Sequence, residues 1–218
     1  MGKLMLSVAI AGMVALTGCS SQESHSVEDA PIPNTAEASA EQLSELANLK
    51  TSIQDDQISE DNYSSIVGLG ESFVNLYTGA VAEQVPVSFR NYIANENLLQ
   101  FADTMLKIEQ QQELNGGNGV IFGRDNEFAK AEIKKVDHNL YYLNLPFSNE
   151  GSGMSCKLLI QSVNNSLVIA DLYFGNKDGA DTFATGHPAV RKVDNPELWN
   201  DREWVADVMQ KLETYETG

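Results

Sequence analysis

A run rich in glycine and asparagine divides this 218-residue chain into two parts with different hydrophobic periods. Residues 115–119 comprise three glycines and two asparagines, a composition that favours a turn over a helix or a strand. Before this run apolar residues recur every three or four positions, and after it they alternate. Because a period near 3.6 indicates helices and a period of two indicates strands, the sequence predicts an α+β fold with its helices first.

Two long helices are predicted before the break. The first is capped by residues 59–61, and the second starts near Asn95 and ends in the polar run 109–113. Gly79 and Pro86 are expected to interrupt the chain between them, and residues 87–93 to form a short helix or a turn. The apolar faces consist of Tyr63, Ile66, Val67, Gly70, Phe73, Val74 and Tyr77 in the first helix, and of Leu98, Phe101, Ala102, Met105, Leu106 and Ile108 in the second.

The part after the break predicts an antiparallel meander of short strands. Turns at residues 137–139 and 164–165 join consecutive strands, and residues 124–127 are expected in a hairpin loop. A loop over residues 175–187 and a final helix that starts at Asn195 and Pro196 complete the domain. The strands are expected at residues 120–122, 129–136, 140–147, 157–163 and 167–174, with Tyr141, Leu143, Leu145 and Phe147 on one face.

The N-terminus predicts export and lipid attachment. Lys3 precedes an apolar stretch at residues 4–16, which is shorter than the about 20 residues that cross a bilayer. The stretch ends in a run that resembles a bacterial lipobox, Leu16-Thr17-Gly18-Cys19. The resemblance implies a signal peptide at residues 1–18, lipid on Cys19, and a location outside the cytoplasm on the cell membrane, or on the outer membrane of a Gram-negative cell.

Charge divides the rest of the chain into an acidic tether at residues 19–57 and a single α+β domain at residues 58–218. Ten acidic residues and one basic residue lie between positions 20 and 62, and the whole chain has a net charge of −17. Acidic charge repels anionic lipid headgroups and argues against a nucleic-acid partner. An apolar stripe in this segment predicts a helix that docks on the domain, pairs with another chain or stays marginal: Leu43, Leu46, Leu49 and Ile53.

The element order over residues 58–174 resembles the NTF2-like (cystatin-like) superfamily. The resemblance implies long helices folded against the concave face of a curled antiparallel sheet, a cone to which this chain adds a C-terminal helix after Trp199. Enzymes of that superfamily use a buried aspartate or histidine base with a tyrosine donor, a set that no residues here match one by one. The spacing that carries the resemblance, also similar to small Gram-positive lipoproteins and conjugation-apparatus domains, is Phe73…Tyr77, Tyr92-Ile93 and Leu98-Leu99.

Candidate catalytic residues are few. Cys156 lies in an apolar run, where a free cysteine is expected to be a small buried hydrophobe. His187 is the candidate general base, because Gly186 and Pro188 constrain its backbone and Asp178 or Asp181 could orient its ring; a loop-packing role is the alternative. No histidine or cysteine spacing typical of a metal site occurs, so neither metal nor cofactor is predicted.

These features favour a lipid-anchored extracytoplasmic protein that presents a non-enzymatic binding or interaction domain at the cell envelope. Its expected partners are the membrane, through lipid on Cys19, and a protein or small ligand whose identity the sequence does not indicate. The pairs Tyr141-Tyr142 and Trp199…Trp204 could line a recognition surface or the core. The alternatives are a small-molecule or isomerase-like pocket, and a component of an envelope assembly such as a conjugative transfer apparatus.

Overall fold

The computed structural model describes residues 35–47, 58–116, 123, 125–164, 166–176 and 179–217. These residues belong to one compact unit, Pro33–Gly218. The predicted signal peptide, the lipid-attachment residue Cys19 and the strand expected at residues 120–122 lie outside the described residues.

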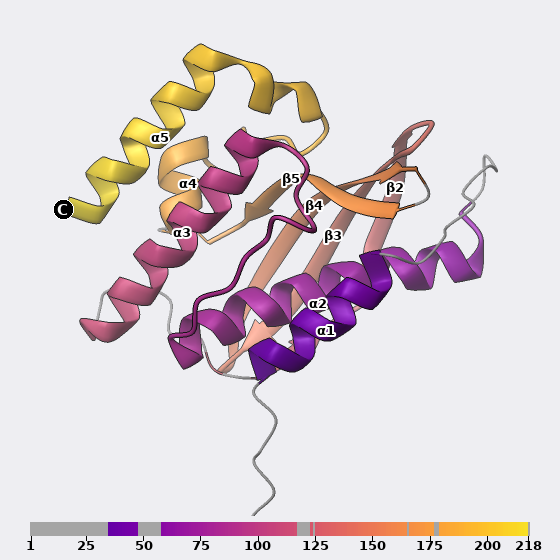
Figure 1. Ribbon diagram of the computed structural model, residues 1–218, viewed down its shortest axis with the longest axis horizontal. Coiled ribbons are helices and arrows are strands. Elements are labelled where there is room, and N and C mark those ends of the chain that lie inside the picture. Colours follow the sequence, from indigo (N-terminus) through magenta and orange to yellow (C-terminus); the bar gives the residue numbers. More distant parts are fainter. Residues whose placement is uncertain are drawn as a thin grey trace, which may run out of the picture. The chain divides into compact units, whose positions relative to one another are not determined.

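The described part of the chain has the predicted α+β organisation, with helices before the sheet (Figure 1). The helices before the sheet are α1 (Thr35–Ala47), α2 (Glu60–Glu83) and α3 (Glu96–Leu114). The strands are β1 (Asn126–Phe128), β2 (Glu132–Asp137), β3 (Leu140–Asn149), β4 (Ser152–Val163) and β5 (Ser166–Phe174). The short helix α4 (Ala180–Thr185), the 3₁₀ helix η1 (Pro196–Asn200) and α5 (Arg202–Thr217) follow. Within these ranges, no helix has the length and apolar character needed to cross a bilayer.

The five strands form an open antiparallel sheet. Its order is β1-β3-β4-β5, and β2 pairs with β3 beside β1, at the other end of that strand. At the β5 edge, the Ile169 N–H donates to the Tyr92 carbonyl at 2.7 Å, which ties the segment between α2 and α3 to the sheet. The predicted meander is confirmed, whereas closure into a cone is not seen.

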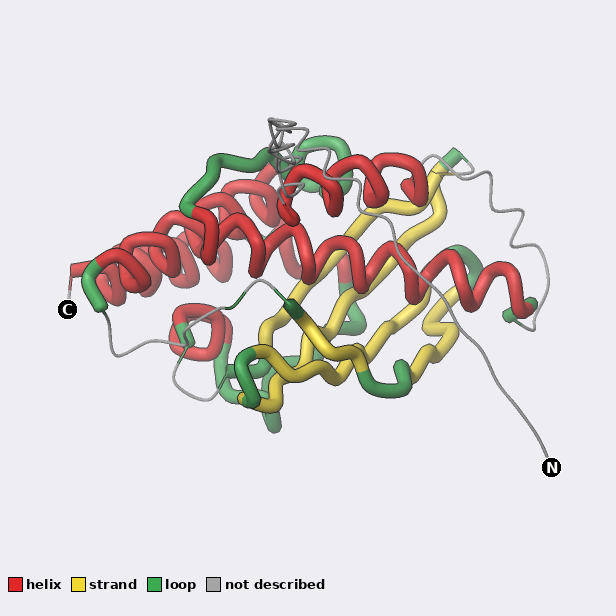
Figure 2. The backbone as a smooth tube through the Cα atoms, turned by 90° about the horizontal axis from the view of Figure 1, so that it is seen from below, coloured by secondary structure: helices red, strands yellow, loops and turns green. Residues whose placement is uncertain are grey.

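The long helices cover one face of the sheet, here called the inner face (Figure 2). The alternating face predicted for β3 is confirmed, because Tyr141, Leu143 and Leu145 are fully buried in the core against the helices. Helix α2 approaches this strand so closely that a Cβ at Gly70 would lie 2.4 Å from Leu143 Cδ2. The contact explains why glycine stands at a position that faces the sheet.

The interruption expected at Gly79 is wrong, since α2 continues to Glu83. Gly79 lies where α1 crosses α2, and a Cβ there would be 3.3 Å from the Ala36 backbone nitrogen. On α1, Leu43 is fully buried in the main core. Helix α1 therefore docks on the domain, and the folded unit extends to the N-terminal side of residue 58, where the sequence predicted its start. Leu49 and Ile53 of the predicted stripe lie outside the described residues.

Three further expectations differ from the structure. Residues 126–128 form strand β1 on β3 and are not part of a hairpin loop, and residues 180–185 of the predicted loop form α4. The final helix is divided, because the Asp201 side chain accepts from the backbone N–H groups of Glu203 and Trp204 and starts a new helix after η1. The cap expected at residues 59–61 and the helix start expected near Asn95 are confirmed, because the side chains of Ser59 and Asn95 accept hydrogen bonds from the first turns of α2 and α3.

The outer face of the sheet, opposite the long helices, carries a second and smaller apolar cluster. Val193 belongs to this cluster although it comes from the loop after α4, so that loop packs over the outer face. The cluster consists of Leu140, Leu159, Ala170, Tyr173 and Val193, with Tyr142 packed against it.

Candidate functional site

A groove of about 480 Å³ lies on the outer face, between β2 and the loop after α4; we call it the outer groove. One acidic side chain, Asp194, stands among its lining residues, together with Tyr142 and small apolar groups. The chain has 31 acidic residues and only 14 lysines and arginines, yet five of these cations line this one groove. They are Lys134, Lys135, Lys157, Arg191 and Lys192.

Strand register places two of the lysines on the outer face. Lys134 on β2 lies opposite Tyr142 on β3, which lies opposite Leu159 on β4. Lys157 on β4 lies opposite Tyr173 on β5. Directly paired residues share a face of the sheet, and Leu159 and Tyr173 belong to the outer cluster. Lys134 and Lys157 therefore project from the outer face, on either side of the Tyr142 ring.

Both lysines contact aromatic rings and keep their charged ends near solvent. The Nζ atom of Lys134 is 6.0 Å from the Tyr142 ring centroid, and that of Lys157 is 5.5 Å from the Tyr173 centroid. Lys134 also pairs with Glu132 at 2.8 Å, and the hydrogen bond to this carboxylate raises the pKa of Lys134. Because both members of that pair are more than half exposed, the ion pair holds the lysine only weakly.

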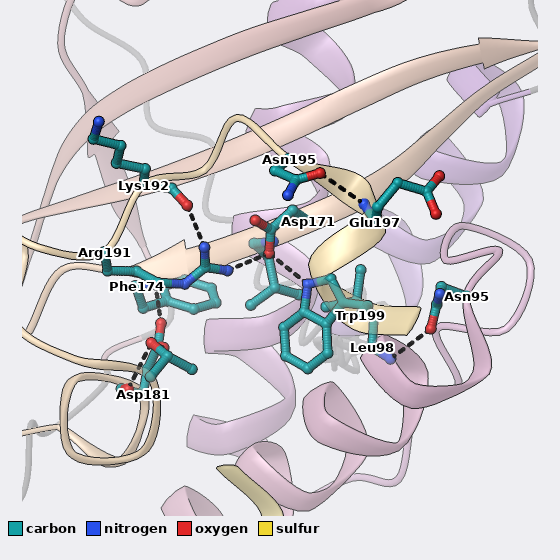
Figure 3. A network of polar contacts seen from close by, with 12 residues as sticks. Asn95, Leu98, Asp171, Phe174, Asp181, Arg191, Lys192, Asn195, Glu197 and Trp199 are labelled. Atoms are coloured by element: carbon teal, nitrogen blue, oxygen red, sulfur yellow. Dashed lines mark hydrogen bonds and ion pairs between the residues drawn. The ribbon is translucent and has the colours of Figure 1, made fainter. Parts of the chain in front are cut away.

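A buried polar network holds the loop that forms the other wall of the groove (Figure 3). Asp171 on the edge strand β5 is fully buried, and its Oδ1 accepts from Arg191 Nη2 at 2.5 Å and from Trp199 Nε1 at 2.7 Å. The same oxygen accepts from the Leu172 backbone N–H at 2.9 Å. The other terminal nitrogen of Arg191 donates to the Lys192 carbonyl. These bonds tie the loop and η1 to the sheet.

The electrostatics of the network fit a structural ion pair. Burial raises the pKa of Asp171, and the charge and hydrogen bonds of Arg191 and the hydrogen bond of Trp199 oppose that rise. The Arg191 guanidinium also lies 5.6 Å from the Trp204 ring centroid. Two buried atoms of the pair, Asp171 Oδ2 and Arg191 Nε, have no hydrogen-bond partner among the residues that the structure describes. The arginine therefore has an unused donor while it lines the groove.

Asp181 forms a separate buried site on α4. Its Oδ2 accepts from the Phe174 backbone N–H at 2.5 Å, and its Oδ1 lies 2.8 Å from the Thr185 hydroxyl. Burial raises the pKa of Asp181 to about 8. The Thr185 hydroxyl is also 3.0 Å from the Asp181 carbonyl, and its one proton serves a single acceptor. If Asp181 Oδ1 is protonated, both contacts are satisfied: the Asp181 carboxyl donates to the Thr185 hydroxyl, and this hydroxyl donates to the Asp181 carbonyl.

Other titratable groups near Asp181 belong to the packing between helices and sheet. Burial raises the pKa of Glu109 on α3 to about 7, and a hydrogen bond with Tyr77 on α2 opposes the rise. Cys156 is fully buried, as predicted, and burial together with the nearby Asp181 raises the pKa of its thiol. A thiol with a raised pKa stays protonated, which suits a core residue and not a nucleophile.

The structure does not bring the predicted catalytic set together around His187. The side chain is exposed at the start of the groove loop, and its Nδ1 accepts from the Ala189 backbone N–H at 3.3 Å. Asp181, expected to orient the ring, is bound to Phe174 and Thr185, and Asp178 lies outside the described residues. Over the described ranges, no cluster of three or more histidine, cysteine, aspartate or glutamate side chains could hold a metal ion.

Sequence reasoning missed the five cations of the outer groove. A signal was present, since Lys134-Lys135 and Arg191-Lys192 are adjacent pairs of cations in an acidic chain. Of the aromatic residues considered for recognition, Tyr142 does line the groove, whereas Tyr141 and Trp199 are buried in the core. Comparisons of the chain with protein-family models, curated proteins and solved structures found no match.

Proposed function

We propose that this protein is a non-enzymatic binding domain that holds an anionic ligand in the outer groove. The observation that carries the proposal is the gathering of five of its 14 basic residues at one groove in a chain of net charge −17. Two strands, β2 and β4, and the loop after α4 contribute them. A cleft lined by charge of one sign concentrates ligands of the opposite sign, and here the cleft has the sign opposite to the whole molecule.

The donors in the groove favour an anion as ligand. Lysine and arginine side chains donate hydrogen bonds and accept none, so a carboxylate or phosphate complements them. The Nε–H of Arg191, a residue of the groove lining, has no acceptor among the described residues. A volume of about 480 Å³ is also within the usual size of ligand sites.

The titratable groups of the domain support binding over catalysis. A general base must lie within hydrogen-bond reach of a nucleophile or substrate. The acids with the most clearly raised pKa values, Asp181 and Glu109, pack with the core on the inner side of the sheet, away from the groove lining. His187 uses Nδ1 within its own turn.

The cellular setting belongs to the same proposal. Lipid on Cys19, at the end of the run Leu16-Thr17-Gly18-Cys19, would anchor the protein outside the cytoplasm. The acidic residues between positions 20 and 62 would hold the domain away from anionic headgroups. A distant relation to the NTF2-like superfamily is likewise proposed, and the helices-first order and antiparallel sheet support it.

Binding of small multivalent anions tests the function. The full chain with Cys19→Ser, which carries no lipid, is titrated with tripolyphosphate or citrate while its thermal unfolding is followed. We expect each anion to raise Tm, and the double variant Lys157→Gln/Lys192→Gln to lose most of this rise. Lys107→Gln/Lys130→Gln, an equal change of charge at two exposed lysines outside the groove lining, serves as the control. An equal response in all three proteins would refute a role for the groove.

A further inference from the structure

We infer that the occupant of the outer groove is an extended acidic segment of a partner protein, with apolar side chains between its carboxylates. The inference rests on the proposed function and narrows the ligand to one chemical class. It depends on how the apolar and the charged groups are distributed around the groove.

Exposed valines occur in both of the segments that form the groove, strand β2 and the loop after α4. Val136 on β2 lines it and is 41% exposed, and Val190 in the loop between Ala189 and Arg191 is 76% exposed. Few large apolar side chains of the described residues are this accessible. A small inorganic anion would leave both valines in water, whereas a peptide with apolar side chains would cover them.

The cations are too far apart for one anionic group. Lys134 on β2 and Lys157 on β4 are separated by two strand spacings, which is about 10 Å. Lys192 belongs to the loop on the other wall. An extended peptide repeats side chains on one face every about 7 Å, so two carboxylates on that face with an apolar side chain between them are about 14 Å apart and can reach different lysines.

The type of cation favours single carboxylates. Arg191, whose planar guanidinium suits paired oxygens, is already bound to Asp171. The lysines act as point charges and accept a carboxylate in many orientations. The lysines can therefore bind the separate carboxylates of an acidic peptide without the preoriented set of donors that a phosphate site contains.

The charge of the whole molecule favours a narrow partner over a broad anionic surface. With a net charge of −17, the protein is repelled as a body by an anionic membrane or a nucleic acid. A single extended segment contacts only the groove, where the local charge is positive. An acidic peptide thus gains the attraction of the lysines with the least repulsion from the remaining surface.

Fluorescence anisotropy with designed peptides tests the inference on the full chain with Cys19→Ser. The first probe is a labelled peptide of repeated Glu-Glu-Val-Val, which places both residue types on each face of an extended chain; the second replaces valine with serine at the same charge. We expect the glutamate–valine peptide to bind about fivefold more tightly, and Lys157→Gln and Lys192→Gln each to weaken it about two- to fivefold. Val190→Ser should weaken only the glutamate–valine peptide, and Lys107→Gln should weaken neither.

Each alternative outcome has a distinct meaning. If tripolyphosphate and citrate bind the groove but the two peptides bind alike or not at all, the inference is wrong and the proposed function stands. If no anion and no peptide binds, the proposed function fails as well. If vesicles of phosphatidylglycerol bind more tightly than the peptides and Val190→Ser abolishes that binding, the occupant is a membrane and the inference is overturned.

Discussion

Replacing Asp181 with asparagine tests whether the buried carboxyl on α4 is neutral in the folded protein. Burial raises the pKa of this group from 3.8 to about 8. The folded state therefore keeps a proton that the unfolded chain releases between these two values. Stability that is fully present below the unfolded pKa is lost as the pH rises through this window.

The magnitude follows from proton linkage. Within the window, each pH unit removes about 1.4 kcal/mol from the free energy of unfolding. Between about pH 5 and about pH 7 the loss from Asp181 alone is therefore about 3 kcal/mol. For a domain of this size that loss lowers Tm by about 6–12 °C.

Asparagine reproduces the neutral carboxyl without its titration. Its amide oxygen can accept from the Phe174 N–H, and its NH₂ group can donate to the Thr185 hydroxyl, as the protonated carboxyl does. Near pH 5 the unfolding free energy of Asp181→Asn should thus stay within about 1 kcal/mol of that of the parent protein. At higher pH the variant should be the more stable of the two, by an amount that grows up to about pH 8.

Urea unfolding of both proteins across this pH range provides the measurement. Glu109, whose pKa burial raises to about 7, adds a slope of the same sign, so the difference between the two proteins isolates Asp181. Asp207→Asn, the same change at an exposed residue paired with Lys211, is the matched control and should leave the slope unchanged. A strongly destabilised Asp181→Asn protein with the parental slope would show that the carboxylate is charged.

Four other changes have defined outcomes. Asp171→Ala leaves the Arg191 charge buried and unpaired, so urea unfolding should show a loss of about 3–5 kcal/mol. Cys156→Ala should cost about 1 kcal/mol, and a thiol reagent should label Cys156 slowly in the native protein and rapidly in denaturant. His187→Ala should leave Tm and the biological phenotype nearly unchanged; complete loss of function in a well-folded variant would restore His187 as the candidate general base. Cys19→Ser should release the protein from the membrane or leave it unprocessed in cell fractionation.

Local sequence patterns predicted the elements whose stability is local or periodic. The cap at Ser59, the helix start near Asn95 and the alternation along β3 are examples, because each depends on near neighbours. The interruption predicted at Gly79 was wrong because this glycine answers to a long-range contact, the close packing of α1 on α2, and not to a local break in the helix. The short α4 was missed because a helix of six residues has little stability of its own, and Asp181 attaches it to β5 through the Phe174 N–H.

The outer groove depends on long-range register, which no local pattern contains. Lys157 reaches the outer face because it pairs with Tyr173, and a slip of one residue would turn it toward the core. The loop wall stays beside these strands because Arg191 is bound to Asp171, 20 positions earlier. Both contacts join residues that are far apart in the sequence. The sequence therefore shows two adjacent pairs of cations but does not indicate that they form one site with Lys157. The Asp171–Arg191 pair accordingly links the stability of the domain to ligand binding. A variant that breaks the pair should destabilise the domain and also displace Arg191 and the loop that carries Lys192, so that two of the five groove cations lose their positions.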